Sequence, residues 1–188
     1  RNFASFPHDK VWELADQAIW HQEAPFGGVS TLLYHQAHDL AKARGVTVLL
    51  EGQGGDELFG GYGYCRPPYY LDLLEAGGWR AVRRESKETP GESRDWLSQA
   101  RLLREGRVKP VYYDGSTHLR ADCVSGDIRK NAPPPVYPTP FSDHLRNALY
   151  RDLCVTKLPR VLRMNDRVSM AYSRELRHPL IDPHTGRP

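Results

Sequence analysis

The residues with the clearest potential for chemistry are two acids, Asp56 and Glu57, which follow a glycine-rich turn. A run of apolar and β-branched residues, 46–50, comes directly before the turn and predicts a short buried strand. We expect the acids to lie in the first turn of a short helix. A strand that ends in a glycine turn and then a helix is where α/β proteins place anionic ligands.

The turn predicts a phosphate site with a metal ion beside it. Glycine at 52, 54 and 55 lets backbone N–H groups approach a phosphate closely, because no Cβ is in the way. Asp56 and Glu57 repel phosphate, but their carboxylate oxygens are the ligands that Mg²⁺ prefers. The turn alone leaves one alternative open, in which the acids only stabilise the N-terminus of a helix.

Two longer runs resemble the family of glutamine-dependent asparagine synthetases. Residues 51–62, Glu-Gly-Gln-Gly-Gly-Asp-Glu-Leu-Phe-Gly-Gly-Tyr, resemble its S-G-x-G-x-D-E-x-x-G-G-Y signature. Residues 158–182 resemble its L-P-x-x-L-R-x-x-D-R-x-S-M-A-x-S-x-E-x-R-x-P-F-L-D pattern, and Pro25, Phe26 and Ser30 fit the segment that precedes the first motif. The stretch 66–140 has no such match.

The resemblance implies an ATP-dependent ligase of the glutamine-hydrolysing type. Such an enzyme activates a carboxylate as an acyl-adenylate and then amidates it with ammonia derived from glutamine. In this sequence Asp56 would hold Mg²⁺ against the phosphates of ATP. Gly52, Gly54 and the backbone of Glu51 would border the nucleotide, although the family usually has Ser where Glu51 stands.

The resemblance also places Gln53 and Glu175 opposite the acceptor acid, as catalytic residues. Asparagine synthetases usually carry Glu where this chain has Gln53. Gln forms hydrogen bonds but cannot act as a base. The acceptor is therefore left open between aspartate and a related acid, and acid–base chemistry at Gln53 is in question.

Three features of these synthetases are missing from this sequence: an S-G-G-x-D-S pyrophosphate loop, the N-terminal Cys of the glutaminase domain, and a Lys downstream of P-F-L-D. The resemblance thus implies an internal part of the C-terminal synthetase domain, inactive by itself. Its fold would be that of the adenine-nucleotide α-hydrolase-like ATP pyrophosphatases. The implied partners are ATP, a small acid acceptor and the glutaminase domain of the same parent chain. A cytoplasmic location and a homodimer also agree with the resemblance.

The periodicity of apolar residues predicts a mostly α fold with a small parallel β element. Predicted helices cover residues 11–21, 30–43, 69–74, 79–84, 96–105, 141–156 and 158–172, with Ser30 as an N-cap. Predicted strands cover 46–50 and 177–182, and 85–93 is a predicted loop. We expect an αβ unit at 1–65, a variable region at 66–140 that ends in the Pro-rich linker 132–140, and an Arg-rich helical region at 141–188.

The composition excludes several classes of protein. Of 188 residues, 39% are hydrophobic and the net charge is only +3, so a general nucleic-acid role is not indicated. No apolar run is long enough to span a membrane. Three widely spaced cysteines suit a reducing compartment and lack the spacing of a zinc site. We expect the closest histidine pair, His35 and His38, to lie on a solvated helix face.

The second motif has an arginine-rich face. It contains Arg160, Arg163, Arg167 and Arg174, at three-, four- and seven-residue spacing. The adjacent, mostly apolar face contains Leu158, Val161, Leu162, Asn165, Val168 and Tyr172. Two interpretations stay open: a solvated basic side with Asp166 in an ion pair, or arginines that order a loop or screen ATP.

Two alternative functions of the whole chain also stay open: a non-catalytic domain of the same fold and a nucleic-acid module.

Overall fold

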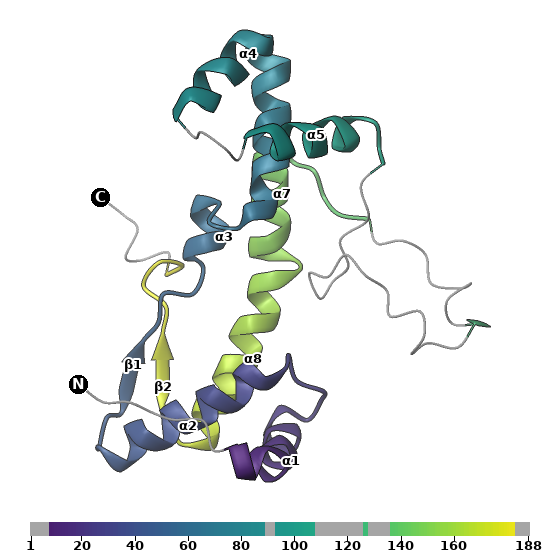
Figure 1. Ribbon diagram of the computed structural model, residues 1–188. Coiled ribbons are helices and arrows are strands. Elements are labelled where there is room, and N and C mark those ends of the chain that lie inside the picture. Colours follow the sequence, from purple (N-terminus) through teal and green to yellow (C-terminus); the bar gives the residue numbers. More distant parts are fainter. Residues whose placement is uncertain (1–7, 89–92, 108–125, 128–135, 183–188) are drawn as a thin grey trace. The chain divides into compact units, whose positions relative to one another are not determined.

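A computed structural model describes residues 8–88, 93–107, 126–127 and 136–182 (Figure 1). The chain forms two compact units. The first comprises Arg1–Gly54 with Pro159–Pro188, and the second comprises Gly55–Leu158.

The first unit contains a two-stranded parallel sheet, visible in Figure 1 as β1 beside β2. Its elements are η1 (His8–Lys10), α1 (Val11–Gln22), α2 (Val29–Ala43), β1 (Val48–Leu50), all but the first two residues of α8 (Lys157–Ala171), and β2 (Glu175–Arg177). Val48 is opposite Glu175 and Leu50 is opposite Arg177. The ladder ends where the Glu51 N–H donates to the Arg177 carbonyl, at 2.9 Å. The turn after β1 therefore starts at a fixed point of this sheet.

A small apolar core joins α1 to α2. Leu14, Ala18 and Leu32 are buried in it, and the partly buried Val11 and Phe26 pack against them. These positions recur at the spacing of one helix face, which is why the sequence folds here into an amphipathic pair. The pair positions α2, which leads through the Gly45 turn to the strand β1.

The second unit is helical. Its elements are α3 (Gly55–Phe59), η2 (Gly63–Cys65), α4 (Arg66–Glu88), α5 (Ser93–Arg104) and α7 (His144–Cys154). Its core of Tyr70, Leu71, Val82 and Ala100 lies between α4 and α5. Gly78, at φ 57° and ψ −156°, interrupts the helical backbone of α4, as expected for a residue without a Cβ.

Asp72 of α4 holds the beginning of α7. Its two carboxylate oxygens accept the N–H groups of His144 and Leu145, at 2.7 and 2.9 Å. Asp143 caps the same helix by accepting the Arg146 N–H, at 2.8 Å. Asp72, Glu75 and His144 also form a cluster of potential metal ligands. The bonds of Asp72 to the backbone, and the 3.2 Å contact of His144 with Glu75, account for this cluster as a helix cap and a side-chain hydrogen bond.

The mostly helical class and the small parallel sheet are confirmed. Helices α1, α2, α5, α7 and α8 lie where they were predicted, with ends that differ by a few residues, and α4 joins the two predicted helices at 69–74 and 79–84. Of the Pro-rich linker 132–140, residues 132–135 lie outside the described residues, and 136–140 contain no helix or strand.

Three local predictions are wrong. Ser30 lies inside α2, whose N-cap is Gly28 at φ 103°, a backbone conformation that favours glycine. The predicted loop 85–93 is helical as far as Glu88, because Pro90 restricts only the residue before it and charged straight-chain residues favour a helix. The second strand is Glu175–Arg177 rather than 177–182, since Pro179 has no N–H to donate to a ladder.

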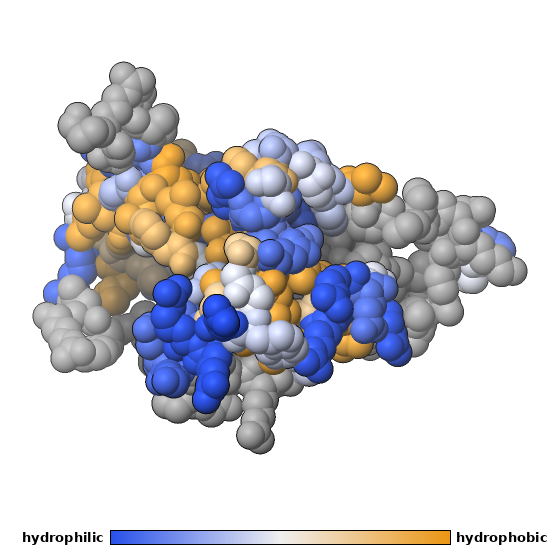
Figure 2. Space-filling view, turned by 90° about the horizontal axis from the view of Figure 1, so that it is seen from above, coloured by the Kyte–Doolittle hydropathy of each residue, from blue (hydrophilic) through white to orange (hydrophobic). Residues whose placement is uncertain are grey.

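Several large apolar side chains are exposed, including Trp12, Trp20 and Phe59, at 84%, 80% and 78% of their surface. Figure 2 shows a face on which apolar side chains lie directly beside strongly hydrophilic ones. Within the described residues, no helix combines the length and apolar character that crossing a membrane requires.

Candidate functional site

The glycine turn follows the carboxyl end of β1. Gly54 has a φ of +90°, a conformation that a residue with a side chain rarely adopts, and it is buried. A Cβ on Gly52 would meet no atom within 4 Å, so the backbone here is open to approach. Gln53 is half-buried, and its Nε2 donates to the Tyr34 hydroxyl over a long 3.5 Å. The turn thus combines an accessible backbone with one amide side chain directed at α2.

The Glu51 side chain is held within the first unit. Its Oε2 accepts a hydrogen bond from Asn165 Nδ2 at 3.0 Å and lies 3.9 Å from His178 Nδ1. Asn165 is fully buried. The sequence pattern places Asn165 on the mostly apolar face of its helix and predicts no partner for it. A polar residue in a buried stripe is itself a sign of a specific hydrogen bond, because burying an unpaired amide is costly.

Glu175 lies at the other end of the sheet from the turn. It is opposite Val48, whereas Gln53 comes after the last strand residue, Leu50. Its carboxylate is exposed and accepts a hydrogen bond from Arg177 Nε at 2.8 Å. In this parallel register the structure does not bring Gln53 and Glu175 together, and His178 is the residue that follows β2 beside Glu51.

In the second unit, the two acids of the motif have different surroundings. Glu57 is buried, and its Oε1 accepts the Tyr62 hydroxyl at 2.8 Å. Asp56 is exposed, and its side chain has no hydrogen bond to any residue that the structure describes. An exposed carboxylate suits Mg²⁺, which binds one or two carboxylates and keeps other positions for water and phosphate oxygens. Of the two acids, only Asp56 therefore fits a metal ion.

His35 and His38 correct the expectation of a solvated pair, since they are only 1% and 3% exposed. Burial lowers the pKa of His35 to about 4, and the nearby His21 and His38 add to this shift. Its ring meets that of Tyr172 edge-on, with centroids 5.7 Å apart. Both ring nitrogens of His38, and Nε2 of His35, have no hydrogen-bond partner within the described residues. His35 comes three residues after the buried Leu32, and this helical spacing is the sequence signal that indicates burial of His35.

The buried His35 predicts a loss of stability in mild acid. Its pKa is lower in the folded protein than the usual 6.5, so the unfolded chain binds more protons between these values. Stability present above pH 6.5 is therefore lost as the pH falls toward 4, by up to about 3 kcal/mol. Thermal unfolding at pH 7 and pH 5 measures this loss. It should shrink in His35→Met but not in His8→Met, and an equal loss in both variants would contradict the assignment.

The arginine face makes contacts inside the first unit. Arg167 Nη1 donates to Glu23 Oε2 at 2.7 Å, and Arg174 Nη1 donates to the Val46 carbonyl at 2.6 Å. Arg163 is exposed, and Asp166 forms no ion pair with any described residue. The alternative of an ion pair at Asp166 is therefore not seen among the described residues. Arg167 is bound to Glu23 at the end of α1, and Arg174 is bound to the Val46 carbonyl just before β1.

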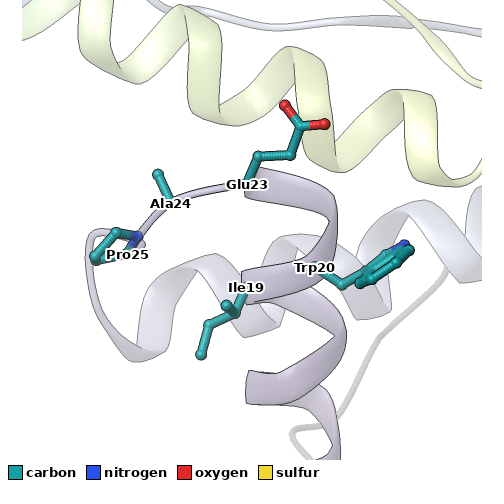
Figure 3. A pocket seen from close by; sticks show the side chains of 5 residues that line it. All are labelled: Ile19, Trp20, Glu23, Ala24 and Pro25. Atoms are coloured by element: carbon teal, nitrogen blue, oxygen red, sulfur yellow. The ribbon is translucent and has the colours of Figure 1, made fainter.

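An open hollow lies at the end of α1, lined by Ile19, Trp20, Glu23, Ala24 and Pro25 (Figure 3). Figure 3 shows the Glu23 carboxylate directed at α8, in agreement with its ion pair with Arg167. None of the candidate residues lines this hollow, and its only charged side chain is already paired. The hollow therefore does not compete with the turn as the candidate site.

Comparisons with known proteins give matches that extend over nearly the whole chain. A family model described as asparagine synthase matches residues 4–184. A Bacillus subtilis protein named asparagine synthetase [glutamine-hydrolyzing] 1 is 28% identical over 197 aligned residues, which cover 94% of this chain and 29% of that protein. A putative asparagine synthetase [glutamine-hydrolyzing] of Mycobacterium tuberculosis is 28% identical over 186 residues, covering 89% and 27%.

A shorter match has higher identity. Putative asparagine synthetase [glutamine-hydrolyzing] 2 of Methanocaldococcus jannaschii is 39% identical over 62 residues, which cover 33% of this chain and 12% of that protein. The chain thus spans less than a third of the length of these relatives. No solved structure matches it significantly.

Proposed function

We propose, because this chain belongs to the asparagine synthase family, that it is part of an ATP-dependent amidotransferase. The full-length protein would adenylate the carboxylate of aspartate or a related acid and amidate it with ammonia. Its relatives are named glutamine-hydrolysing, which supports glutamine as the ammonia source and a glutaminase domain as the partner. The similarity of the chain to this family also supports an ATP pyrophosphatase type of fold for the complete domain.

The observation that carries this proposal is the order of three features along the chain: a strand, then a glycine turn, then an exposed acid. The turn begins at the carboxyl end of β1, offers an open backbone at Gly52, and is followed by Asp56 on the first turn of α3. Backbone N–H groups at such a turn bind phosphate oxygens, and a neighbouring carboxylate serves the cation that accompanies them.

The chain's own residues then have distinct tasks. Gly52, Gly54 and the backbone of Glu51 border the nucleotide, while the Glu51 carboxylate stays with Asn165. Asp56 holds Mg²⁺, which when bound neutralises charge on the phosphates. Gln53 contacts the acceptor through its amide. For Glu175 to contact the acceptor, the acceptor must extend to the exposed part of β2, where Glu175 lies beside Arg177.

Exchange of pyrophosphate into ATP by the full-length protein tests the proposal. We expect exchange that depends on Mg²⁺ and on an acceptor acid, because adenylation is reversible and requires both. Formation of the corresponding amide from glutamine should follow. If no acid tested supports either exchange or hydrolysis of ATP to AMP and pyrophosphate, the alternative of a non-catalytic domain of the same family is favoured.

The acceptor is tested by Gln53→Glu in the full-length protein. The two side chains have nearly the same size, so we expect a retained fold and a change of about tenfold or less in the preference between aspartate and other acids, since a charge in a partly solvated position contributes about 1 kcal/mol or less to an ionic contact. The measurement is kcat/KM for several acids. Gln17→Glu, at an exposed position of α1, is the matched control. Loss of turnover with every acid would show that Gln53 has a task that Glu cannot perform.

A further inference from the structure

The Asp56 carboxylate lies directly against the bare backbone of Gly61. After α3 the chain reverses at Gly60, which has a φ of +68°, and the Gly61 N–H then donates to the Asp56 carbonyl at 3.0 Å. A Cβ on Gly61 would collide with the Asp56 carboxylate and also approach its Cα closely. Gly61 itself does not have a positive φ. Its backbone conformation is therefore open to alanine, and what excludes a side chain is the space that Asp56 occupies.

The next residue, Tyr62, fastens the other acid of the same helix. Its hydroxyl donates to the buried Glu57 at 2.8 Å, and burial together with this bond raises the pKa of Tyr62. The Tyr62 ring stacks on that of Tyr64, with centroids 5.1 Å apart and planes 12° apart. The turn after α3 is thus attached to Asp56 through Gly61 and to Glu57 through Tyr62.

Lys157 covers this aromatic pair. Its Nζ lies 3.2 Å from the centroid of the Tyr62 ring and donates to the Tyr64 hydroxyl at 2.9 Å. A cation over a stacked tyrosine pair is attracted to the ring faces. Lys157 directly precedes the second motif, so this contact fixes the end of the first motif to the start of the second within one unit.

We propose that Gly61 and Tyr62 are positioning residues that set the direction of the Asp56 carboxylate toward its metal ion. This inference rests on the proposed function, in which Asp56 holds Mg²⁺. Gly61 does so by leaving room for the carboxylate on one side. Tyr62 does so by fixing Glu57, the neighbour of Asp56 in α3, while Lys157 holds the Tyr62 ring in place.

The test is the Mg²⁺ concentration that gives half-maximal ATP–pyrophosphate exchange in the full-length protein. We expect Gly61→Ala to raise it about tenfold with only a small change in melting temperature, because the carboxylate must move away while the contact with the Asp56 Cα, at 3.3 Å, requires only a slight backbone shift. Gly126→Ala is the matched control, since a Cβ there meets no atom within 4 Å. Tyr62→Phe keeps the ring for Lys157 but loses the bond to Glu57, and should raise the Mg²⁺ requirement about threefold.

A double variant separates this inference from the proposed function. If Gly61 acts through Asp56, adding Gly61→Ala to Asp56→Asn should cause no further loss, because the two effects are coupled. Losses that multiply, or an unchanged Mg²⁺ requirement in Gly61→Ala and Tyr62→Phe while Asp56→Asn is impaired, would overturn the inference alone. Unimpaired exchange in Asp56→Asn would overturn the proposed metal ligand and the inference with it. Should Gly61→Ala fail to fold, the result for Tyr62→Phe decides.

Discussion

Asp56→Asn in the full-length protein should lower Mg²⁺-dependent ATP–pyrophosphate exchange by orders of magnitude and leave the melting temperature nearly unchanged. The substitution keeps the size of the side chain and one carbonyl-type oxygen but removes the charge. A cation between phosphates depends on anionic oxygen, so its binding suffers. Asn stabilises the start of a helix about as well as Asp, so α3 should persist.

The two interpretations of Asp56 give opposite outcomes in this experiment. A metal ligand loses exchange and keeps its stability, whereas a residue that only stabilises the helix keeps both exchange and stability, because Asn replaces Asp there about equally well. Glu57→Gln is an informative comparison, because Glu57 is buried against Tyr62 rather than exposed. We expect the main effect of Glu57→Gln to be a lower melting temperature. Normal exchange in Asp56→Asn would refute the metal assignment.

Leu71→Ala should be the most destabilising of the substitutions considered, at about 2–5 kcal/mol of the free energy of unfolding of the helical unit. Leu71 is 1% exposed in the core that Tyr70, Val82 and Ala100 share. Its removal takes apolar surface out of that core and leaves a cavity between α4 and α5, which can collapse only in part.

Thermal unfolding of the full-length protein measures this effect. Leu102→Ala on α5 is the matched control, since Leu102 is 40% exposed and should cost much less. Equal losses in both variants would mean that the core of α4 and α5 does not limit the stability of the protein. The Gly61→Ala variant provides a third comparison, because its effect should appear in metal dependence instead.

Most of the helices and strands were predictable from the sequence, because the sequence patterns that indicate them are local. The apolar spacing along α1 and α2, and the glycines that end α2 and interrupt α4, each act within a few residues. The differences concern helix ends. Pro90 predicts an earlier helix end than the one observed at Glu88, and Ser30 predicts an N-cap that Gly28 provides instead.

The candidate site divides in the same way. The glycine turn and Asp56 are close together in the chain, so the sequence alone predicts a cation ligand that follows a phosphate-binding turn. It also singled out Gln53 and Glu175, but their separation depends on the register of two strands that are far apart in the sequence. That register puts Glu175 beside Val48 and leaves His178 beside Glu51.

By itself, then, the sequence determined the family, the helical class and the order of the chemical groups along the motifs, because each depends on residue type and short-range spacing. Only the tertiary structure decided which groups meet. It buried His35 and His38, paired Glu51 with Asn165, and set Asp56 against Gly61. Such contacts follow from packing and strand register, which are set by the burial of apolar surface across the unit rather than by any one stretch of sequence.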